Sequence, residues 1–237
     1  MSVQVIAHRG ASGTCPENTL PAFRRAVEIG AHMIELDVQL TADGHPVVIH
    51  DLTLPRTTNG RGAVRRRTLA EIAALDAGGW FAARFADARV PTLGAVLAEI
   101  AIPINVELKA AGDDGLERRT LEVVEAAGAL GRVVFSSFDA ESLRRLRALS
   151  REAELAVLWP GRSYAKALGL ADRFAAKSVH LRNDSAVTDA VARVHEAGLT
   201  VRVWTVNTPE DFAFLTNAGI DGVFTDYPER FLDASLA

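Results

Sequence analysis

Acidic side chains alternate with apolar ones in two short segments of the chain. In Met33–Val38 the apolar residues occupy one face of a strand, while Glu35 and Asp37 occupy the other; in Ile104–Leu108, Glu107 has the same setting. If the two segments are neighbouring strands, three carboxylates converge, and like charges this close need protons or a cation to neutralise them. Because the candidate ligands are all oxygens, the expected cation is hard, Mg²⁺ or Ca²⁺. A structural network of ion pairs with basic residues is the alternative.

Two histidines end strand-like segments close to these acids in the predicted arrangement. His8 is followed by Arg9, and His50 is followed by Asp51. Histidine suits proton transfer near neutral pH, and two of them can act as acid and base in one turnover. Either histidine alone would be interpreted as structural, but their joint occurrence beside the acids favours catalysis. Arg9 could hold a phosphate through two hydrogen bonds, and Lys109 could do so as a point charge.

Later strand-like segments carry further inward-facing candidates. Trp204 shares a face with Arg202 and Val206, so it could form a wall for a ligand or simply fill the core. His180 and Arg182 share a face of another segment, where we interpret them as structurally buried residues. These positions add possible lining to the site but no chemistry of their own.

Strand-like and helical patterns alternate along the whole chain. The strands are expected at Val3–Ala7, Met33–Val38, Ile104–Leu108, Val133–Ser136, Leu155–Trp159, Ser178–Leu181, Val201–Thr205 and Gly222–Thr225. Helices are expected at Asn18–Ile29, Leu116–Ala127, Ala140–Leu149, Thr188–Ala197 and Pro209–Ala218. Such alternation predicts a parallel sheet, and eight units of roughly 30 residues favour an α/β protein with a TIM (β/α)₈ barrel, in one domain over residues 1–237. An open doubly wound sheet is the alternative, although the glycine-rich turn typical of dinucleotide binding is absent after the first strand.

One segment interrupts the alternation. Thr41–Gly44 contains an Asp-Gly turn and leads into the strand-like run Pro46–His50. This connection is too short for a parallel crossover, so the run is expected to pair antiparallel with the preceding strand. We interpret residues 45–90, approximately, as a small cap inserted between the second barrel strand and its helix.

Composition limits the class of protein. Of the 237 residues, 49% are hydrophobic, and the formal net charge is −4, which gives no support to nucleic acid as a partner. The chain contains no apolar run of about 20 residues, so stable membrane insertion is not expected. The first residues lack a secretory signal, and the single cysteine excludes an intrachain disulfide; we therefore expect a cytoplasmic protein. Nothing in the sequence sets the oligomeric state.

An ordered series of short motifs resembles the glycerophosphodiester phosphodiesterase family. The matching stretches are His8–Gly10, Pro16–Thr19, Glu35–Val38, His50–Asp51, Arg56–Gly60, Leu75–Gly78, Pro91–Leu93, Glu107–Lys109, Ser136–Phe138, Trp204–Asn207 and Thr225–Asp226. A single His-Arg-Gly is a weak signal, whereas this set spans nearly the whole chain in order. The resemblance implies a TIM barrel with an inserted cap, which agrees with the layout expected from periodicity.

The resemblance also implies an activity: metal-dependent hydrolysis of glycerophosphodiesters to sn-glycerol 3-phosphate and an alcohol. In the reaction of this family, the glycerol 2-hydroxyl attacks phosphorus, and water then opens the cyclic glycerol phosphate. The roles implied are metal ligands for Glu35, Asp37 and Glu107, acid–base catalysts for His8 and His50, phosphate contacts for Arg9 and Lys109, and a substrate border for Trp204.

Two other functions remain open from the sequence. The same site could act on lysophospholipids, as a lysophospholipase D does, although no basic amphipathic stretch marks a membrane-docking surface. A non-catalytic barrel could bind phosphodiesters or a protein partner. Binding alone does not need two proton shuttles, so the pair of histidines favours an enzyme acting on a small-molecule glycerophosphodiester.

Overall fold

Eight parallel strands alternate with helices in the computed structural model, which describes residues 3–109, 112, 115–185 and 188–232. The parallel strands are β1 (Gln4–Ala7), β2 (Met33–Leu40), β4 (Ile104–Leu108), β5 (Val133–Ser137), β6 (Glu154–Trp159), β7 (Ser178–Arg182), β8 (Thr200–Trp204) and β9 (Gly222–Thr225). Each lies within two residues of a strand expected from the sequence. The strand order β1-β9-β8-β7-β6-β5-β4-β2 closes through pairing of β1 with β2, so the fold is a TIM barrel.

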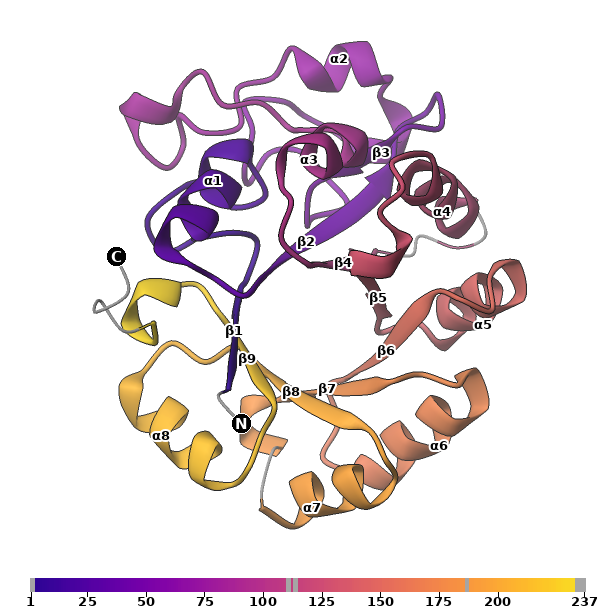
Figure 1. Ribbon diagram of the computed structural model, residues 1–237. Coiled ribbons are helices and arrows are strands. Elements are labelled where there is room, and N and C mark those ends of the chain that lie inside the picture. The colour runs from indigo at the N-terminus through magenta and orange to yellow at the C-terminus, as the bar shows by residue number, and fades with distance from the viewer. Residues whose placement is uncertain (1–2, 110–111, 113–114, 186–187, 233–237) are drawn as a thin grey trace.

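Helices surround the barrel, as Figure 1 shows in a view along its axis. They are α1 (Leu20–Ile29), α3 (Leu93–Glu99), α4 (Leu116–Ala126), α5 (Ala140–Leu149), α6 (Tyr164–Phe174), α7 (Thr188–Glu196) and α8 (Pro209–Asn217). Within the described ranges, each helix is either too short or too polar to cross a bilayer.

The two faces of each strand serve different purposes. Outward-facing residues such as Ile34, Leu36 and Val106 are fully buried against the helices, in the large core between barrel and helix ring. Inside the barrel, a smaller apolar cluster that includes Ile6 and Phe224 fills the interior. The polar inward residues of β2 and β4 therefore lie above a closed, packed interior, near the strand ends where barrel enzymes carry their sites.

The start of α1 differs from the sequence prediction in a way that concerns the site. The helix was expected from Asn18 but begins at Leu20. Asn18 has a left-handed backbone with φ 57°, which ends helical geometry there, and its side-chain amide donates to Asp37 Oδ2 at 2.7 Å. The residue thus leaves the helix to contact the acidic cluster.

The predicted hairpin and insertion both follow β2. β3 (Pro46–Val48) pairs antiparallel with β2, as expected, although the strand ends at Val48 rather than at His50. The chain then passes through the 3₁₀ turn η1 (Val64–Arg66), α2 (Leu69–Ala73) and a second 3₁₀ turn, η2 (Ala83–Phe85), before α3 (Figure 1). A separate small core, which includes Leu54, Val64 and Ile72, holds this segment together. Because β3 is registered on β2, the insertion begins beside the acidic face of the barrel.

Candidate active site

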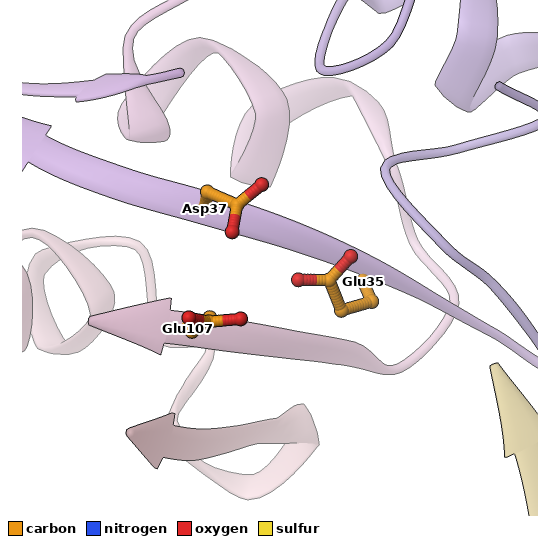
Figure 2. A group of neighbouring side chains, drawn as sticks. All are labelled: Glu35, Asp37 and Glu107. Atoms are coloured by element: carbon orange, nitrogen blue, oxygen red, sulfur yellow. The ribbon is translucent and has the colours of Figure 1, made fainter. Parts of the chain in front are cut away.

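The three predicted acids come together inside the barrel. Pairing of β2 with β4 sets Asp37 opposite Glu107, and Glu35 lies one pleat earlier on the same face. Figure 2 shows their carboxyl groups turned toward one another from the two strands. One oxygen from each lies within 4.8 Å of the others, and the residues are 3%, 0% and 8% exposed, respectively.

Two basic side chains neutralise only part of this charge. Lys109 contacts Glu107 and lies 3.1 Å from Asp37 Oδ1, and Arg9 Nε lies 3.3 Å from Asp37 Oδ2. Within the part of the chain that the structure describes, the Glu35 carboxylate accepts only the backbone N–H of Arg9, at 2.8 Å. Two cations therefore face three carboxylates.

The pKa values of the acids follow from this arrangement. Burial, together with the neighbouring Asp37, raises the pKa of Glu107 to about 7 and the pKa of Glu35 well above its usual range. Burial also opposes ionisation of Asp37, but Lys109 and Arg9 outweigh it and hold the pKa of that carboxyl far below normal. The cluster is short of positive charge.

The donor set fits a hard divalent cation. Buried Oε1 of Glu35 and Oδ1 of Asn105 have no hydrogen-bond partner among the described residues, although buried carboxylate and amide oxygens are normally paired. No thiol or imidazole belongs to the described cluster of acids, and its oxygens are the ligands that Mg²⁺ and Ca²⁺ prefer.

His8, directly after β1, is held by Asp226, which directly follows the neighbouring strand β9. Its Nδ1 lies 2.7 Å from Asp226 Oδ1, and because a carboxylate only accepts, Nδ1 carries the proton. Asp226 also accepts from the Ser12 hydroxyl at 2.9 Å and from the Asn207 amide at 2.7 Å. Burial opposes ionisation of Asp226, but these partners lower its pKa to about 2. Nε2 of His8 is left to face the cavity.

His50 is oriented by a longer chain of charges. Its Nδ1 lies 2.7 Å from Asp51 Oδ1, and Arg56 donates to both oxygens of Asp51 at 2.7 and 2.9 Å. Arg56 also binds both oxygens of Glu17, at 2.7 and 2.8 Å, and Glu17 accepts from Arg9 at 2.9 Å. An unbroken ionic path thus joins the support of His50 to the arginine beside the acidic cluster.

The surroundings of His50 favour its neutral form. Burial lowers its pKa, and the positive charges of Arg9 and Lys109 lower it further, against the opposing effect of Asp37. Asp51 stays ionised beside it, since hydrogen bonds from Arg56 hold the pKa of that carboxyl at about 2.

These groups line one cavity of about 220 Å³. Its charged and imidazole-bearing lining residues are His8, Arg9, Glu35, His50, Glu107 and Lys109. The opposite wall is apolar and includes Phe138 and Trp204, whose rings meet edge to face with centroids 5.4 Å apart. The Trp204 indole N–H donates to the His180 carbonyl at 3.2 Å, so the wall has a fixed orientation. A polar, charged end and an apolar wall suit a small phosphorylated polyol.

The later strands are only partly as expected from the sequence. Trp204 and Arg202 point inward, but Val206 packs in the outer core, because β8 ends at Trp204 and its alternation stops there. His180 is fully buried, as interpreted, whereas Arg182 is exposed and pairs with Asp184.

The turn after β1 depends on a glycine. Gly10 has φ 80°, and a Cβ at this position would lie 2.6 Å from the backbone of Ala22 in α1. This close approach lets Arg9, itself left-handed at φ 56°, aim its N–H at Glu35. The His-Arg-Gly spacing therefore has a steric reason.

Seven of the eight predicted site residues line one cavity, and the eighth, Asp37, is buried behind its wall in contact with Lys109 and Arg9. The structure adds supporting residues to which the sequence assigned no role, namely Glu17, Asn18, Asp51, Arg56, Asn105, Asn207 and Asp226. Most of them lie within the motif stretches quoted above, so the motifs were the available signal. Their partners are distant in the chain, and only the fold identifies them.

Comparison with known proteins gives a consistent result. The model of the glycerophosphoryl diester phosphodiesterase family matches residues 8–230. A glycerophosphodiester phosphodiesterase from Caldanaerobacter subterraneus subsp. tengcongensis is 40% identical over 98% of each chain. A phosphodiesterase from Oleispira antarctica, solved in complex with the product sn-glycerol-3-phosphate, superposes with a TM-score of 0.87 at 32% identity, over 96% of this chain and 94% of that one. The glycerophosphodiester phosphodiesterase of Agrobacterium tumefaciens superposes with a TM-score of 0.85 at 29% identity, over 98% and 99% of the two chains.

Proposed function

The chain belongs to the glycerophosphoryl diester phosphodiesterase family and is an enzyme of that class, and we propose that it hydrolyses small glycerophosphodiesters to sn-glycerol 3-phosphate and an alcohol with the help of a divalent cation. In this proposal His8 and His50 exchange protons with the substrate, Glu35, Asp37 and Glu107 hold Mg²⁺ or Ca²⁺, and the reaction passes through a cyclic glycerol phosphate.

One observation carries the proposal. Two histidines line the same cavity as the acids, and each has its Nδ1 held by a carboxylate, so that Nε2 is left for the substrate. Acid–base catalysis needs this arrangement, since one group must take a proton while another gives one. A barrel that only binds phosphodiesters has no use for two oriented imidazoles.

The acids provide the place for the cation. When bound, it would stabilise negative charge growing on the phosphoryl oxygens and lower the pKa of a nearby hydroxyl. Arg9 and Lys109 add fixed positive charge at the same end of the cavity. Trp204 and Phe138 border the carbon skeleton of the glycerol on the apolar side.

In the first step, the glycerol 2-hydroxyl oxygen forms a bond to phosphorus, and the bond from phosphorus to the alcohol oxygen breaks. One histidine takes the hydroxyl proton at Nε2, and the other gives its Nε2 proton to the departing oxygen. Asp226 and Asp51 stabilise the imidazolium form of their respective partners and fix their orientation.

In the second step, water adds to phosphorus and the bond to the 2-oxygen breaks. The two histidines exchange roles, because the first now carries a proton and the second has lost one. The products are sn-glycerol 3-phosphate and the free alcohol, and both rings return to their starting state. The product named for the Oleispira structure supports this assignment of the phosphorylated product.

The test is an assay of glycerol 3-phosphate release from glycerophosphocholine. We expect release with Mg²⁺ or Ca²⁺ present and its loss with EDTA, restored by added metal. Full turnover in EDTA would contradict the metal assignment. The same assay with a lysophospholipid tests the alternative activity: a higher kcat/KM for the lysolipid than for the soluble diester would overturn the choice of substrate class.

A further inference from the structure

Two further hollows continue from the catalytic cavity toward the insertion. The first, of about 520 Å³, shares His50, Glu107, Lys109 and Phe138 with the cavity. The second, of about 310 Å³, also shares Lys109 and lies between the end of β2 and the insertion. We refer to it as the insertion groove; Thr53 and Arg65 of the insertion line one side of it. A substrate bound at the histidines can therefore extend past Lys109 without leaving the surface of the protein.

The wall of the insertion groove is fixed by backbone hydrogen bonds. Thr53 and Ala63 form an antiparallel bridge, and the N–H of Val64 donates to the Leu52 carbonyl at 3.0 Å. Val64 is fully buried in the small core of the insertion. Arg65 follows directly in η1, so its Cα has a defined position relative to the groove.

Arg65 supplies a positive charge that nothing else in the described chain engages. It has no ion pair or hydrogen bond among the described residues, whereas the nearby Arg67 pairs with Glu71 at 3.0 Å and Lys109 pairs with two acids of the cluster. The described lining of the insertion groove contains no acidic residue. The groove therefore attracts an anion.

The acids in the first hollow do not offset this charge. Asp51 is bound by His50 and Arg56, and Asp139 accepts the N–H groups of Glu141 and Ser142 at the start of α5. Asp139 also lies 3.6 Å from the guanidinium of Arg145, and Glu107, the third acid of this hollow, pairs with Lys109, so each of the three carboxylates already has a cationic partner. The exposed side chains of Leu52 and Phe138, 53% and 45% accessible, leave the path between them apolar.

We propose that Arg65, in the groove that it lines together with Thr53, selects glycerophosphodiesters whose leaving alcohol carries a second phosphate. The scissile phosphate lies between the histidines, the leaving alcohol passes Lys109 over the apolar path, and the second phosphate meets the guanidinium, which can donate two parallel hydrogen bonds to it. This inference rests on the proposed function and specifies the substrate class of the same site.

The experiment compares kcat/KM for two substrates in the wild type and in Arg65→Gln. 1,3-Bis(sn-glycero-3-phospho)glycerol carries the second phosphate, and glycerophosphoglycerol is its counterpart without that charge. We expect Arg65→Gln to lower kcat/KM for the first substrate by roughly three- to tenfold, the effect of one partly exposed charge-assisted contact, and to leave the second within about twofold. Arg65→Lys keeps the positive charge, so it should lose less kcat/KM for the substrate with the second phosphate than Arg65→Gln does.

The matched control is Arg66→Gln, which removes the same charge from the next residue of η1, an exposed side chain that lines none of the three hollows. It should leave the ratio of the two substrates unchanged. An equal loss in Arg65→Gln and Arg66→Gln, or an unchanged ratio in Arg65→Gln, overturns the inference. Absence of turnover with both substrates in the wild type would instead overturn the proposed function, so the two failures are distinguishable.

Discussion

Each of the two histidines in the cavity is oriented by a carboxylate, but the two carboxylates are held in different ways. His8 and the acid that orients it, Asp226, both follow strands of the barrel, and the remaining donors to that acid are the neutral groups of Ser12 and Asn207. His50 belongs to the insertion, and the acid beside it is held by Arg56, whose side chain is 43% exposed. The groups that support His8 therefore belong to the barrel, whereas those that support His50 form a partly exposed chain of ion pairs.

The barrel itself therefore supports one of the two proposed catalytic histidines, and the inserted segment supports the other. The His8 side needs no formal cation for its support, so salt has little to screen. The His50 side depends on Arg56 bridging Asp51 and Glu17, and ion pairs near the surface weaken as ionic strength rises. The two sides should therefore respond differently to mutation, salt and pH.

The largest effect is expected on removal of either imidazole. His8→Ala and His50→Ala should each lower kcat by roughly 10²–10⁴-fold, because each removes one of the two proton carriers. Steady-state assays with glycerophosphocholine measure this, and circular dichroism checks that the variants remain folded. A near-wild-type kcat in a folded variant removes that histidine from the mechanism.

A smaller effect is expected when the orienting acids are neutralised. Asp226→Asn and Asp51→Asn keep the size of the side chain but can no longer stabilise an imidazolium, so kcat should fall by roughly 10²-fold in each. Salt separates the two sides: the kcat values of Asp226→Asn and of the wild type should change in parallel between low and moderate ionic strength. If either Asn variant retains full kcat, its carboxylate does not orient a catalytic group.

Loss of the bridging arginine should cost less and should reveal the salt dependence. Arg56→Gln leaves Asp51 in place but removes four hydrogen bonds to the two acids, and we expect roughly a three- to tenfold loss of kcat at low salt. The difference in kcat between Arg56→Gln and the wild type should become smaller as salt is added. Arg66→Gln, an exposed arginine of the same insertion, is the control and should show no gap at any salt concentration.

A further effect concerns the stability of the fold in acid rather than kcat. The pKa of Asp226 is about 2, below its ordinary 3.8, so the folded state binds this proton less readily than the unfolded chain. That contribution, about 2 kcal/mol, is complete above roughly pH 5 and is lost as the pH falls from about 4 to 2. Urea unfolding should show Asp226→Asn less stable than wild type at pH 6, with the difference shrinking toward pH 2. A difference that stays constant over this range would show that the ionised carboxylate does not stabilise the fold.

The sequence predicts the barrel and the positions of the main site residues because both depend on local patterns. Alternation in Met33–Val38 fixes which side chains point inward, and strand pairing then places Glu107 beside them. The supporting residues could not be predicted in this way, because their partners are distant in the sequence: His8 contacts an acid 218 residues away, and Arg56 contacts Glu17, which is 39 residues away. Their side-chain types fit many surface roles, and only the closed barrel selects the partner.

The insertion was predictable in outline and not in detail. The Asp-Gly turn identifies the hairpin. The path from Thr53 to Ala63, however, is set by a β-bridge between these two residues and by the small core of the insertion, and no periodic pattern in the sequence predicts either of them. The sequence did not predict that Arg65 would be unpaired either, because the run Arg65–Arg67 by itself indicates only a solvated turn. Only the contacts in the folded insertion show that Arg67 of this run pairs with Glu71, whereas Arg65 has no such partner among the described residues.

Calorimetric titration of the metal-free protein with Mg²⁺ and with Ca²⁺ shows whether Glu35, Asp37 and Glu107 hold a divalent cation, as we propose. We expect one ion to bind per chain, and affinity to be at least about tenfold weaker in both Glu35→Gln and Glu107→Gln, because each removes one anionic ligand. Glu125→Gln, the same change on the exposed surface of α4, should bind as the wild type does. Absence of binding to the wild type, or equal affinity in all of these proteins, would contradict the account.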